Sequence, residues 1–233
     1  MPDIPELLLI DKPKGITSFD VIRRLRRTLQ IKKMGHAGTL DPLASGLMLI
    51  GVGKGTKGLT SLVKLDKEYL AEVRIGERRS TGDLEGEIVE EREVKTLTES
   101  EVEVALATLV GALSLPVSAY SAIKVDGVPM YKRARSAEKI GKIVADVPER
   151  EMKVYEAELL KFETGDGRAV ATVRFSVGSG TYIRSLAEEL GRRVGYPATL
   201  QNLRRTKVGE FDIKDAQQLG YIKEIRATFG STD

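Results

Sequence analysis

The chain lacks cysteine altogether, and His36 is its only histidine. The absence of cysteine excludes disulfides, thiol nucleophiles, and zinc or iron–sulfur sites with cysteine ligands. One histidine is too few for a metal site built from several histidines. A lone histidine is also more often a structural residue than a catalytic one.

Long apolar runs are missing as well. The longest are as short as Leu47 to Ile50, so we expect no segment that spans a membrane. The sequence begins Met-Pro-Asp-Ile-Pro-Glu, without the basic and apolar regions of a secretory signal. We therefore expect a cytoplasmic protein.

Several common catalytic motifs are also absent. No Gly-x-Ser-x-Gly elbow occurs, which argues against a serine hydrolase. Residues 51–57 are rich in glycine and lysine, but they lack the Gly-Lys-Ser/Thr ending of a P-loop and the spacing of a dinucleotide fingerprint. We interpret this stretch as a turn after a strand.

Charge is nearly balanced in total, at +3, but it is segregated along the chain. Residues 21–40 are basic without a single acid, and residues 83–103 are strongly acidic. Residues 124–142 and 184–207 are basic again. Such segregation either builds faces that attract nucleic acid or reflects ordinary solvated helix surfaces, and charge alone does not decide between them.

Hydrophobic periodicity predicts strands and helices that do not alternate regularly. The predicted strands are 7–10, 47–52, 69–75, 152–162 and 171–177. The predicted helices begin after Thr17, begin after Thr98 and end at Gly111, and run from 183 to a stop at Gly195. We expect loops at 34–46 and 76–96, the second a hairpin or an exposed loop, and an irregular basic insertion at 116–150.

This order indicates an α+β fold with a mixed, largely antiparallel central sheet flanked by helices. No repeat or linker divides the chain. We therefore expect a single domain, residues 1–233, with the basic excursion at 120–150 inserted in it.

The loop at 35–46 carries the most chemical information. Gly35 and Gly38 allow the backbone to approach a ligand closely, and Pro42 restricts Asp41 to an extended conformation. The result is a carboxylate on a stiff loop directly after a basic helix. Asp41 is either a functional acid or an aspartate that only stabilises a turn or caps a helix.

This loop also resembles a known signature. Gly35-His-Ala-Gly-Thr-Leu-Asp-Pro-Leu-Ala-Ser-Gly46 is similar to the catalytic loop of the TruB-type pseudouridine synthases, which act on uridine 55 of tRNA. Further segments resemble motifs of this family, in family order and over nearly the whole chain: 8–15, 66–69, 120–127 followed by Tyr131 and 134–135, 180–184 and 203–205. The resemblance implies an isomerase that cleaves the uracil–ribose C–N bond, rotates the base and rejoins it through C5.

The resemblance implies three catalytic residues. Asp41 matches the essential aspartate, which either attacks C1′ of the sugar or abstracts the C2′ proton to give a glycal-like intermediate. Arg184 matches the arginine that keeps this aspartate ionised and oriented; its alternative is a surface or phosphate-binding arginine. Tyr69 matches the tyrosine that stacks on the target base and assists at C5; its alternative is a core residue, and both can hold, because the ring can pack while the hydroxyl reaches the site.

The resemblance also implies a set of substrate-binding residues. His36 helps to fill the space left by the flipped base, and Tyr182 and Leu203 shape the uracil pocket. Contacts to backbone phosphates are expected from Lys12, Lys124, Lys132 and Arg135. The implied partner is the T-arm stem–loop of tRNA, bound by a monomer, with no metal, no organic cofactor and no membrane.

The sequence departs from the family pattern at a few points. Ser179 and Ala137 stand where some members have lysine and glycine. The chain ends soon after Leu203, so we expect it to lack the C-terminal RNA-binding domain of many bacterial members. Two other functions stay open: a synthase directed by a guide RNA or by protein partners, and a helper that folds tRNA without catalysis. The presence of Asp41, Tyr69 and Arg184 together favours catalysis.

Overall fold

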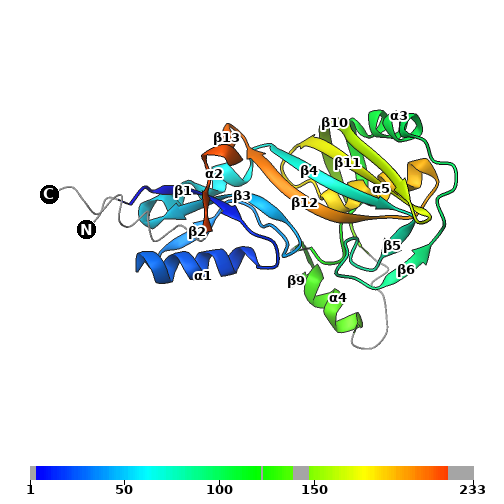
Figure 1. Ribbon diagram of the computed structural model, residues 1–233. Helices are drawn as coiled ribbons and strands as arrows, with labels where there is room; N and C mark the ends of the chain where they lie inside the picture. Colours follow the sequence, from blue (N-terminus) through cyan, green and yellow to red (C-terminus); the bar gives the residue numbers. More distant parts are fainter. Residues whose placement is uncertain (1–3, 122, 139–146, 220–233) are drawn as a thin grey trace. The chain divides into compact units, whose positions relative to one another are not determined.

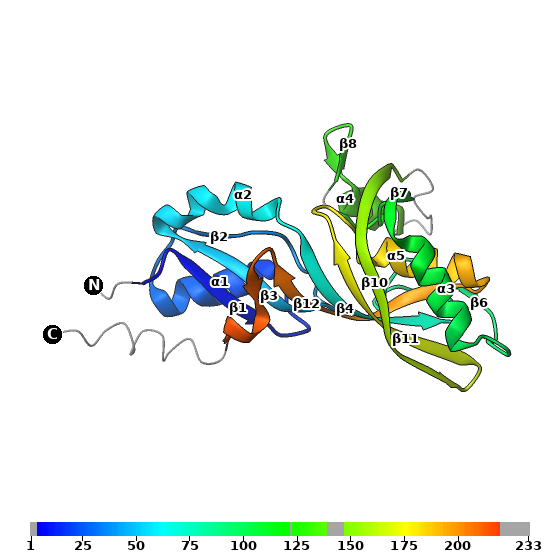
Figure 2. The ribbon, with the colours of Figure 1, turned by 90° about the horizontal axis from the view of Figure 1, so that it is seen from above.

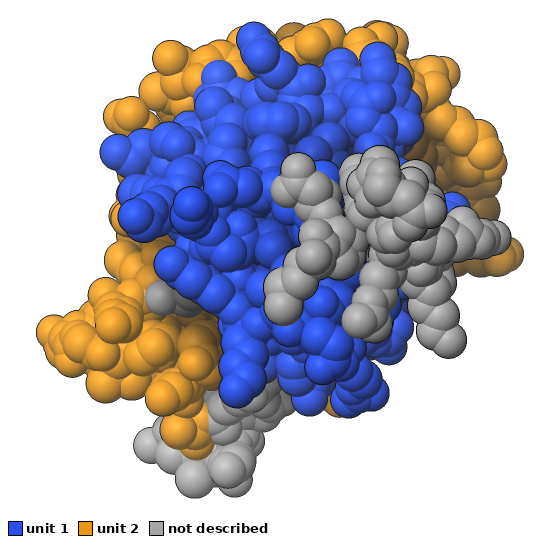
Figure 3. Space-filling model, turned by 90° about the vertical axis from the view of Figure 1, so that its left-hand side faces the viewer, with its two compact units in different colours: residues 1–70, 203–233 blue, residues 71–202 orange. Residues whose placement is uncertain are grey.

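The computed structural model describes residues 4–121, 123–138 and 147–219, without the side chains of Arg135 and Glu138. The chain divides into two compact units, coloured separately in Figure 3. Unit 1 comprises residues 1–70 and 203–233, and unit 2 comprises residues 71–202. Two strands, β4 (Lys67–Ile75) and β12 (Ala198–Val208), carry the chain from one unit to the other.

Unit 1 is built on strands in the order β14-β1-β3-β12, with β2 paired to β3 and β13 to β12. β1 and β3 are antiparallel, whereas β12 is parallel to β3 and β14 is parallel to β1. The other elements of this unit are β1 (Leu7–Lys12), α1 (Ser18–Leu29), β2 (Met34–His36), β3 (Ser45–Val52), η1 (Gly53–Gly58), α2 (Leu59–Val63), β13 (Phe211–Asp212), η2 (Ile213–Asp215) and β14 (Gln217–Gln218).

Helix α1 follows directly from its sequence. The Thr17 side chain accepts a hydrogen bond from the Asp20 amide, and the Asp20 carboxylate binds the Thr17 amide in return, which completes a capping box. One face buries Val21, Ile22, Leu25 and Leu29. The opposite face exposes its basic residues to solvent: Arg23, Arg24 and Arg27. The predicted helix and its cap are confirmed.

In unit 2 the strands follow the order β4-β11-β10-β7, and β10 pairs antiparallel with both of its neighbours. Figures 1 and 2 show α3 and α5 beside these strands, and α3 contacts both β10 and α5. The elements are β5 (Glu77–Arg79), β6 (Ile88–Glu91), α3 (Glu99–Leu109), β7 (Gly111–Pro116), β8 (Lys124–Val125), β9 (Val128–Pro129), α4 (Met130–Glu138), β10 (Glu149–Gly165), β11 (Arg168–Val177) and α5 (Ile183–Val194).

The core of unit 2 comes from strict alternation along its strands. Every second residue of β4 and of β11 is buried, so that Val73, Ile75, Val173 and Phe175 have no exposed surface. The α+β class with a mixed, largely antiparallel sheet and flanking helices is therefore confirmed.

Three sequence predictions need correction. The loop predicted at 34–46 begins with the short strand β2. The insertion at 116–150 is not irregular where it is described: it contains the hairpin β8–β9, helix α4 and the start of β10. Ala122 and residues 139–146 lie outside the described residues. Strand β12 was missed, because polar residues such as Thr199 and Arg205 are buried in it, so that its sequence does not show an apolar face.

The first testable prediction compares two glycines of unit 1 that both have positive φ. A Cβ on Gly46 (φ +108°) would lie 2.3 Å from the Arg205 carbonyl oxygen, whereas a Cβ on Gly15 (φ +82°) would meet nothing within 4 Å. Gly15→Ala should lower the free energy of unfolding by about 1 kcal/mol, and Gly46→Ala by about 3 kcal/mol or more, because β3 and β12 must separate. Urea unfolding measures both; equal losses would contradict the close approach.

Candidate active site

Main-chain contacts on both sides fix the Asp41 loop of unit 1. The Ser18 hydroxyl donates to the Leu40 carbonyl at 2.9 Å and accepts from the Leu40 amide at 2.8 Å, so the first turn of α1 holds the residue before Asp41. The Gly15 amide donates to the Pro42 carbonyl at 2.8 Å, and the Ala44 amide donates to the Asp41 carbonyl at 3.1 Å. The Asp41 side chain, which is half-buried, therefore projects from a backbone that cannot easily shift.

Arg205 of β12 supports the same loop from inside. Its side chain is 1% exposed, its Nε donates to the Leu47 carbonyl at 2.7 Å, and its Nη2 donates to the Gly38 carbonyl at 3.3 Å. One guanidinium thus joins the two ends of the segment that carries Asp41. In the sequence, Arg205 stands only within the motif at 203–205 and has no predicted role of its own, since a basic residue on a polar strand looks like a surface residue.

Lys12 of β1 also lies in the interior of unit 1. The residue has no exposed surface, and its ammonium donates to the carbonyls of Ile16 at 2.7 Å and Pro13 at 3.1 Å. A phosphate cannot reach an ammonium that is enclosed in this way, so the predicted phosphate contact is corrected. Lys12 instead holds the turn at 13–16, whose Gly15 amide binds the Asp41 loop.

His36 ends β2 just before this loop. Burial lowers the pKa of the imidazole below its ordinary value; a hydrogen bond with the Gly38 backbone raises it in part, and the positive charge of Arg205 lowers it further. Its Nδ1 is buried and has no hydrogen-bonding partner among the residues that the structure describes. Because its pKa lies below the ordinary value of 6.5, the imidazole is mainly neutral at pH 7.

Tyr69 and Lys67 share the buried face of β4. Tyr69 is 8% exposed, so its ring packs as a core residue does, in line with the second of the two interpretations drawn from the sequence. Lys67 donates to the carbonyls of Val63 and Leu65 at the end of α2. Burial, with a further contribution from the charge of Arg205, lowers the pKa of Lys67 to about 8. Leu203 of β12 is buried as well.

Arg184 lies in the first turn of α5, inside unit 2. Its guanidinium donates to the Thr81 carbonyl at 2.9 Å and to the Tyr120 carbonyl at 3.2 Å, and it pairs with Asp83 at 3.6 Å. The residue is 6% exposed, so the alternative of a surface arginine is wrong. Tyr182, the N-cap residue of α5, stands two residues before Arg184 in the sequence and is half-buried.

Asp83 is a residue of this arrangement that the sequence did not reveal. It is 3% exposed, and its Oδ1 accepts hydrogen bonds from the Thr81 hydroxyl at 2.6 Å and from the Glu85 amide at 3.1 Å. Most of the acidic stretch 83–103 is exposed, and nothing in its composition distinguishes the one aspartate that turns inward. The Thr-Gly-Asp turn after a strand was the only available signal.

The predicted basic insertion is a folded hairpin followed by a helix. Arg133 donates to the Val125 carbonyl at 2.6 Å and pairs with Asp126 at 2.8 Å, which fixes α4 to the hairpin β8–β9. Lys124 and Lys132 are exposed. Arg135 lies in α4, but its side chain is outside the described residues. The two lysines are therefore accessible to a polyanion.

Two further observations concern ligands and membranes. Among the described residues, no three histidine, aspartate or glutamate side chains lie close enough to hold a metal ion. In the same part of the chain, no helix is long and apolar enough to cross a membrane.

Comparisons with known proteins identify the fold and the family. The structure is similar to a chain of the archaeal box H/ACA sRNP Nop10–Cbf5 complex (TM-score 0.68, 24% identity, 97% of this chain and 55% of that chain). It is also similar to a chain of an H/ACA RNP bound to a substrate RNA containing 2′-deoxyuridine (TM-score 0.69, 23% identity, 97% and 56%). This chain spans little more than half the length of these two, and at such identities the likeness shows the fold alone.

The sequence comparisons are more specific. The family model for the TruB family pseudouridylate synthase (N terminal domain) matches residues 26–183. The tRNA pseudouridine synthase B of Leifsonia xyli is 41% identical over 230 residues, covering 97% of this chain and 74% of that protein. The protein of the same name from Corynebacterium efficiens is 39% identical over 218 residues, covering 94% and 72%. The chain belongs to the TruB family of pseudouridylate synthases.

The second testable prediction concerns the protonation of His36, the only histidine. Its C2–H proton resonance should titrate below pH 6.5 in the folded protein and near 6.5 in urea, because burial lowers the folded-state pKa. The unfolded chain then binds more protons between these two pKa values, so stability falls as the pH drops through this range. In His36→Asn, used as the control, this part of the pH dependence should vanish. A folded-state midpoint at or above 6.5 would contradict the prediction.

Proposed function

We propose that this protein converts uridine 55 in the T loop of tRNA to pseudouridine. The relatives that carry the name tRNA pseudouridine synthase B match the chain nearly throughout, which supports a tRNA substrate. The observation that carries the proposal is the position of Asp41, a carboxylate on a loop whose backbone is fixed by Ser18, Gly15 and Arg205. A preorganised carboxylate is what either route to glycosidic cleavage needs.

In the proposed reaction, Asp41 acts on the ribose of a uridine that has left the base stack. The carboxylate either attacks C1′ as a nucleophile or removes the C2′ proton, and in both routes the C–N bond to uracil breaks. The base then rotates and forms a bond from C5 to C1′, the C5 proton leaves, and N1 takes up a proton in its place. In the second route the proton removed from C2′ is also returned. The product is therefore an isomer of the substrate, and the reaction needs no co-reactant.

Arg184 and Tyr69 complete the proposed catalytic set. The family resemblance assigns Arg184 to hold the aspartate ionised and oriented, and the guanidinium is itself oriented by two carbonyls and Asp83. Tyr69 offers a ring held in place by β4 for stacking on the uracil, and its hydroxyl assists the loss of the C5 proton. We propose that both units together form one catalytic domain, 1–233.

The proposed substrate-binding residues act on the base and on the backbone. The neutral imidazole of His36, next to the Asp41 loop, replaces the flipped base, while Tyr182 and Leu203 shape the uracil pocket. Lys124 and Lys132, with Arg135 of the same helix, contact phosphates and position the RNA. The proposed partner is the T-arm stem–loop, bound by a monomer in the cytoplasm, where tRNA is found.

The third prediction tests the function itself. Incubated alone with an unmodified tRNA transcript or with its isolated T-arm stem–loop, the protein should form pseudouridine at position 55. Asp41→Asn should abolish the product while RNA binding stays within about tenfold, because the carboxylate acts on the nucleotide and does not hold the backbone. The measurements are pseudouridine mapping and filter binding.

The outcomes of this experiment separate the candidate functions. Product that appears only after addition of a guide RNA or a protein partner would favour a directed synthase. Binding with no product under any condition would favour a tRNA-folding helper. Turnover by Asp41→Asn at the wild-type rate would refute the assignment of the carboxylate.

The fourth prediction concerns the exposed lysines of the insertion. Replacing Lys124 and Lys132 by alanine should flatten the log–log salt dependence of RNA binding by about one to two units, since each lost phosphate contact removes about 0.7. The single-turnover rate at saturating RNA should stay unchanged. The control is Lys161→Ala, which removes an exposed lysine that pairs with Glu163. A slope as steep as that of the wild type would show that the insertion does not bind phosphates.

A further inference from the structure

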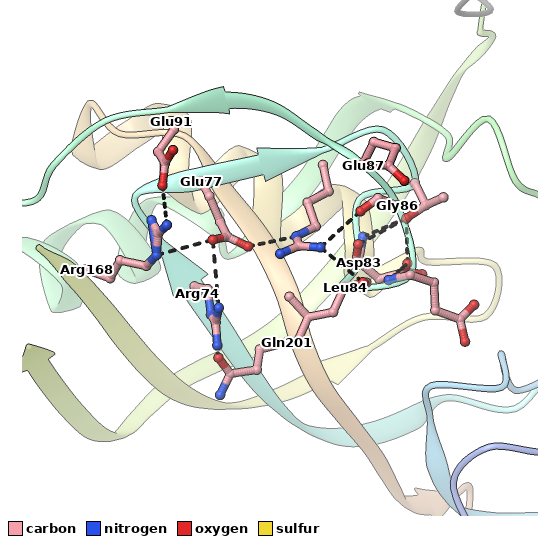
Figure 4. Close-up of polar contacts among 12 residues, drawn as sticks. Arg74, Glu77, Asp83, Leu84, Gly86, Glu87, Glu91, Arg168 and Gln201 are labelled. Carbon is pink, nitrogen blue, oxygen red and sulfur yellow. Dashed lines mark hydrogen bonds and ion pairs between the residues drawn. The ribbon is translucent and has the colours of Figure 1, made fainter. Parts of the chain in front are cut away.

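Unit 2 contains a buried carboxylate that the proposed reaction does not use. Glu77, in β5, is 1% exposed, and three arginines converge on it. Arg79 donates to its Oε1 at 2.7 Å, Arg168 lies 3.2 Å from its Oε2, and Arg74 lies 3.7 Å from the same oxygen. Figure 4 shows Glu77 facing Arg74 and Arg168, with Gln201 beyond Arg74.

Arg79 connects this carboxylate to the turn that follows β5. Its Nη1 donates to the Leu84 carbonyl at 3.2 Å and to the Gly86 carbonyl at 3.1 Å. The same guanidinium therefore binds Glu77 through Nε and two carbonyls of the turn through Nη1. Figure 4 shows Asp83, Leu84 and Gly86 close together in this turn.

The turn after β5 also contacts Arg184. Thr81 offers its carbonyl to the Arg184 guanidinium, and Asp83 pairs with it. The turn is further closed by the Gly82 amide, which donates to the Arg79 carbonyl at 3.0 Å, and by the Gly86 amide, which donates to the Asp83 carbonyl at 3.3 Å. The contacts from Glu77 to Arg184 thus form an unbroken path within unit 2.

The turn also lies close to the start of α5. A Cβ on Gly82 would be in ordinary van der Waals contact with Cβ of Arg184, at 3.4 Å, and with Oε1 of Glu188, at 3.6 Å. If the turn moved by a few tenths of an ångström, the hydrogen bond that the Thr81 carbonyl accepts from Arg184 would change in length and direction.

The charge of Glu77 is needed for this arrangement. Arg79 is 21% exposed at its side chain, and Arg168 and Arg74 are about one-third exposed or less. Arg168 also pairs with Glu91. Without the Glu77 carboxylate, Arg79 and Arg74 would lose this partner and the three cations would repel one another, so that Arg79 would be drawn towards solvent and away from the turn. A neutral amide of the same size would keep the volume but not the attraction.

We propose that Glu77 and Arg79 are positioning residues for the synthase reaction, which act by fixing the turn that orients the Arg184 guanidinium. This inference rests on the function proposed above, in which Arg184 serves the catalytic aspartate. It predicts that the two residues affect the chemical step and not the affinity for RNA, since Glu77 is buried and the Arg79 guanidinium binds groups of the protein itself.

The experiment measures Glu77→Gln and Arg79→Lys in the full chain by single-turnover kinetics at saturating tRNA, together with RNA binding. Both variants should lose about tenfold in rate, with the dissociation constant within about twofold of the wild type. Arg79→Lys keeps the charge but has no planar group to reach Glu77 and two carbonyls together. Thermal unfolding identifies the temperature at which each variant is fully folded, and rates are compared there.

A double-mutant cycle separates positioning from general weakening of the fold. If Glu77 acts through Arg184, Glu77→Gln should cost no further rate in an Arg184→Lys background. The matched control is Glu189→Gln, which removes a nearly buried carboxylate that pairs with Arg192 and Arg193 in the same unit. It should lower stability without a loss of rate at saturating tRNA.

The results distinguish this inference from the function on which it rests. If the wild-type protein forms no pseudouridine, the proposed function fails. If the wild type is active and both variants react at its rate, or if the losses add fully to that of Arg184→Lys, the positioning role is refuted and the cluster only stabilises unit 2.

Discussion

The loops around the candidate site residues depend on one interaction, the donation of hydrogen bonds from a buried cation to main-chain carbonyls. Arg205 binds the carbonyls of Gly38 and Leu47 around the Asp41 loop, and Lys12 binds those of Pro13 and Ile16 in the adjoining turn. In unit 2, Arg184 binds the carbonyls of Thr81 and Tyr120. Loop carbonyls that lack partners in a sheet or helix must find donors elsewhere, and charged donors give hydrogen bonds worth about 1.5–3 kcal/mol each. The loops are therefore rigid without regular secondary structure.

The elements with a clear period could be predicted from the sequence, and those stabilised by side-chain-to-backbone contacts could not. Helix α1 shows its capping box and its apolar face in the sequence, and β11 shows its alternation. Strand β12 shows neither, since one of its largest buried side chains is Arg205. Residue type predicts burial only on average, and a guanidinium with enough acceptors can lie in the interior.

Only part of the candidate site could be predicted from the sequence, because the rest also depends on side-chain contacts that leave no pattern in it. Asp41 stands in a motif with glycines and a proline that constrain it, so the sequence alone marks it as the candidate catalytic residue. Asp83 and Lys12 have no such marking: one lies in an acidic stretch and the other in a turn rich in lysine and proline. Asp83 pairs with Arg184, which is distant in sequence. Lys12 donates to carbonyls that face it only when the turn has folded.

The buried guanidinium of Arg205 affects both the conformation of the Asp41 loop and the protonation of its neighbours. The positive charge of Arg205 lowers the pKa of both His36 and Lys67, in addition to the effect of burial on each. Loss of this guanidinium would release the carbonyls of Gly38 and Leu47 and would at the same time make both neighbours easier to protonate. Burial is the main reason that the imidazole beside the Asp41 loop is neutral, and the residue that holds the loop adds to this effect. Because Arg205 contributes to both, a change at this residue would alter the geometry and the charge of this part of unit 1 together.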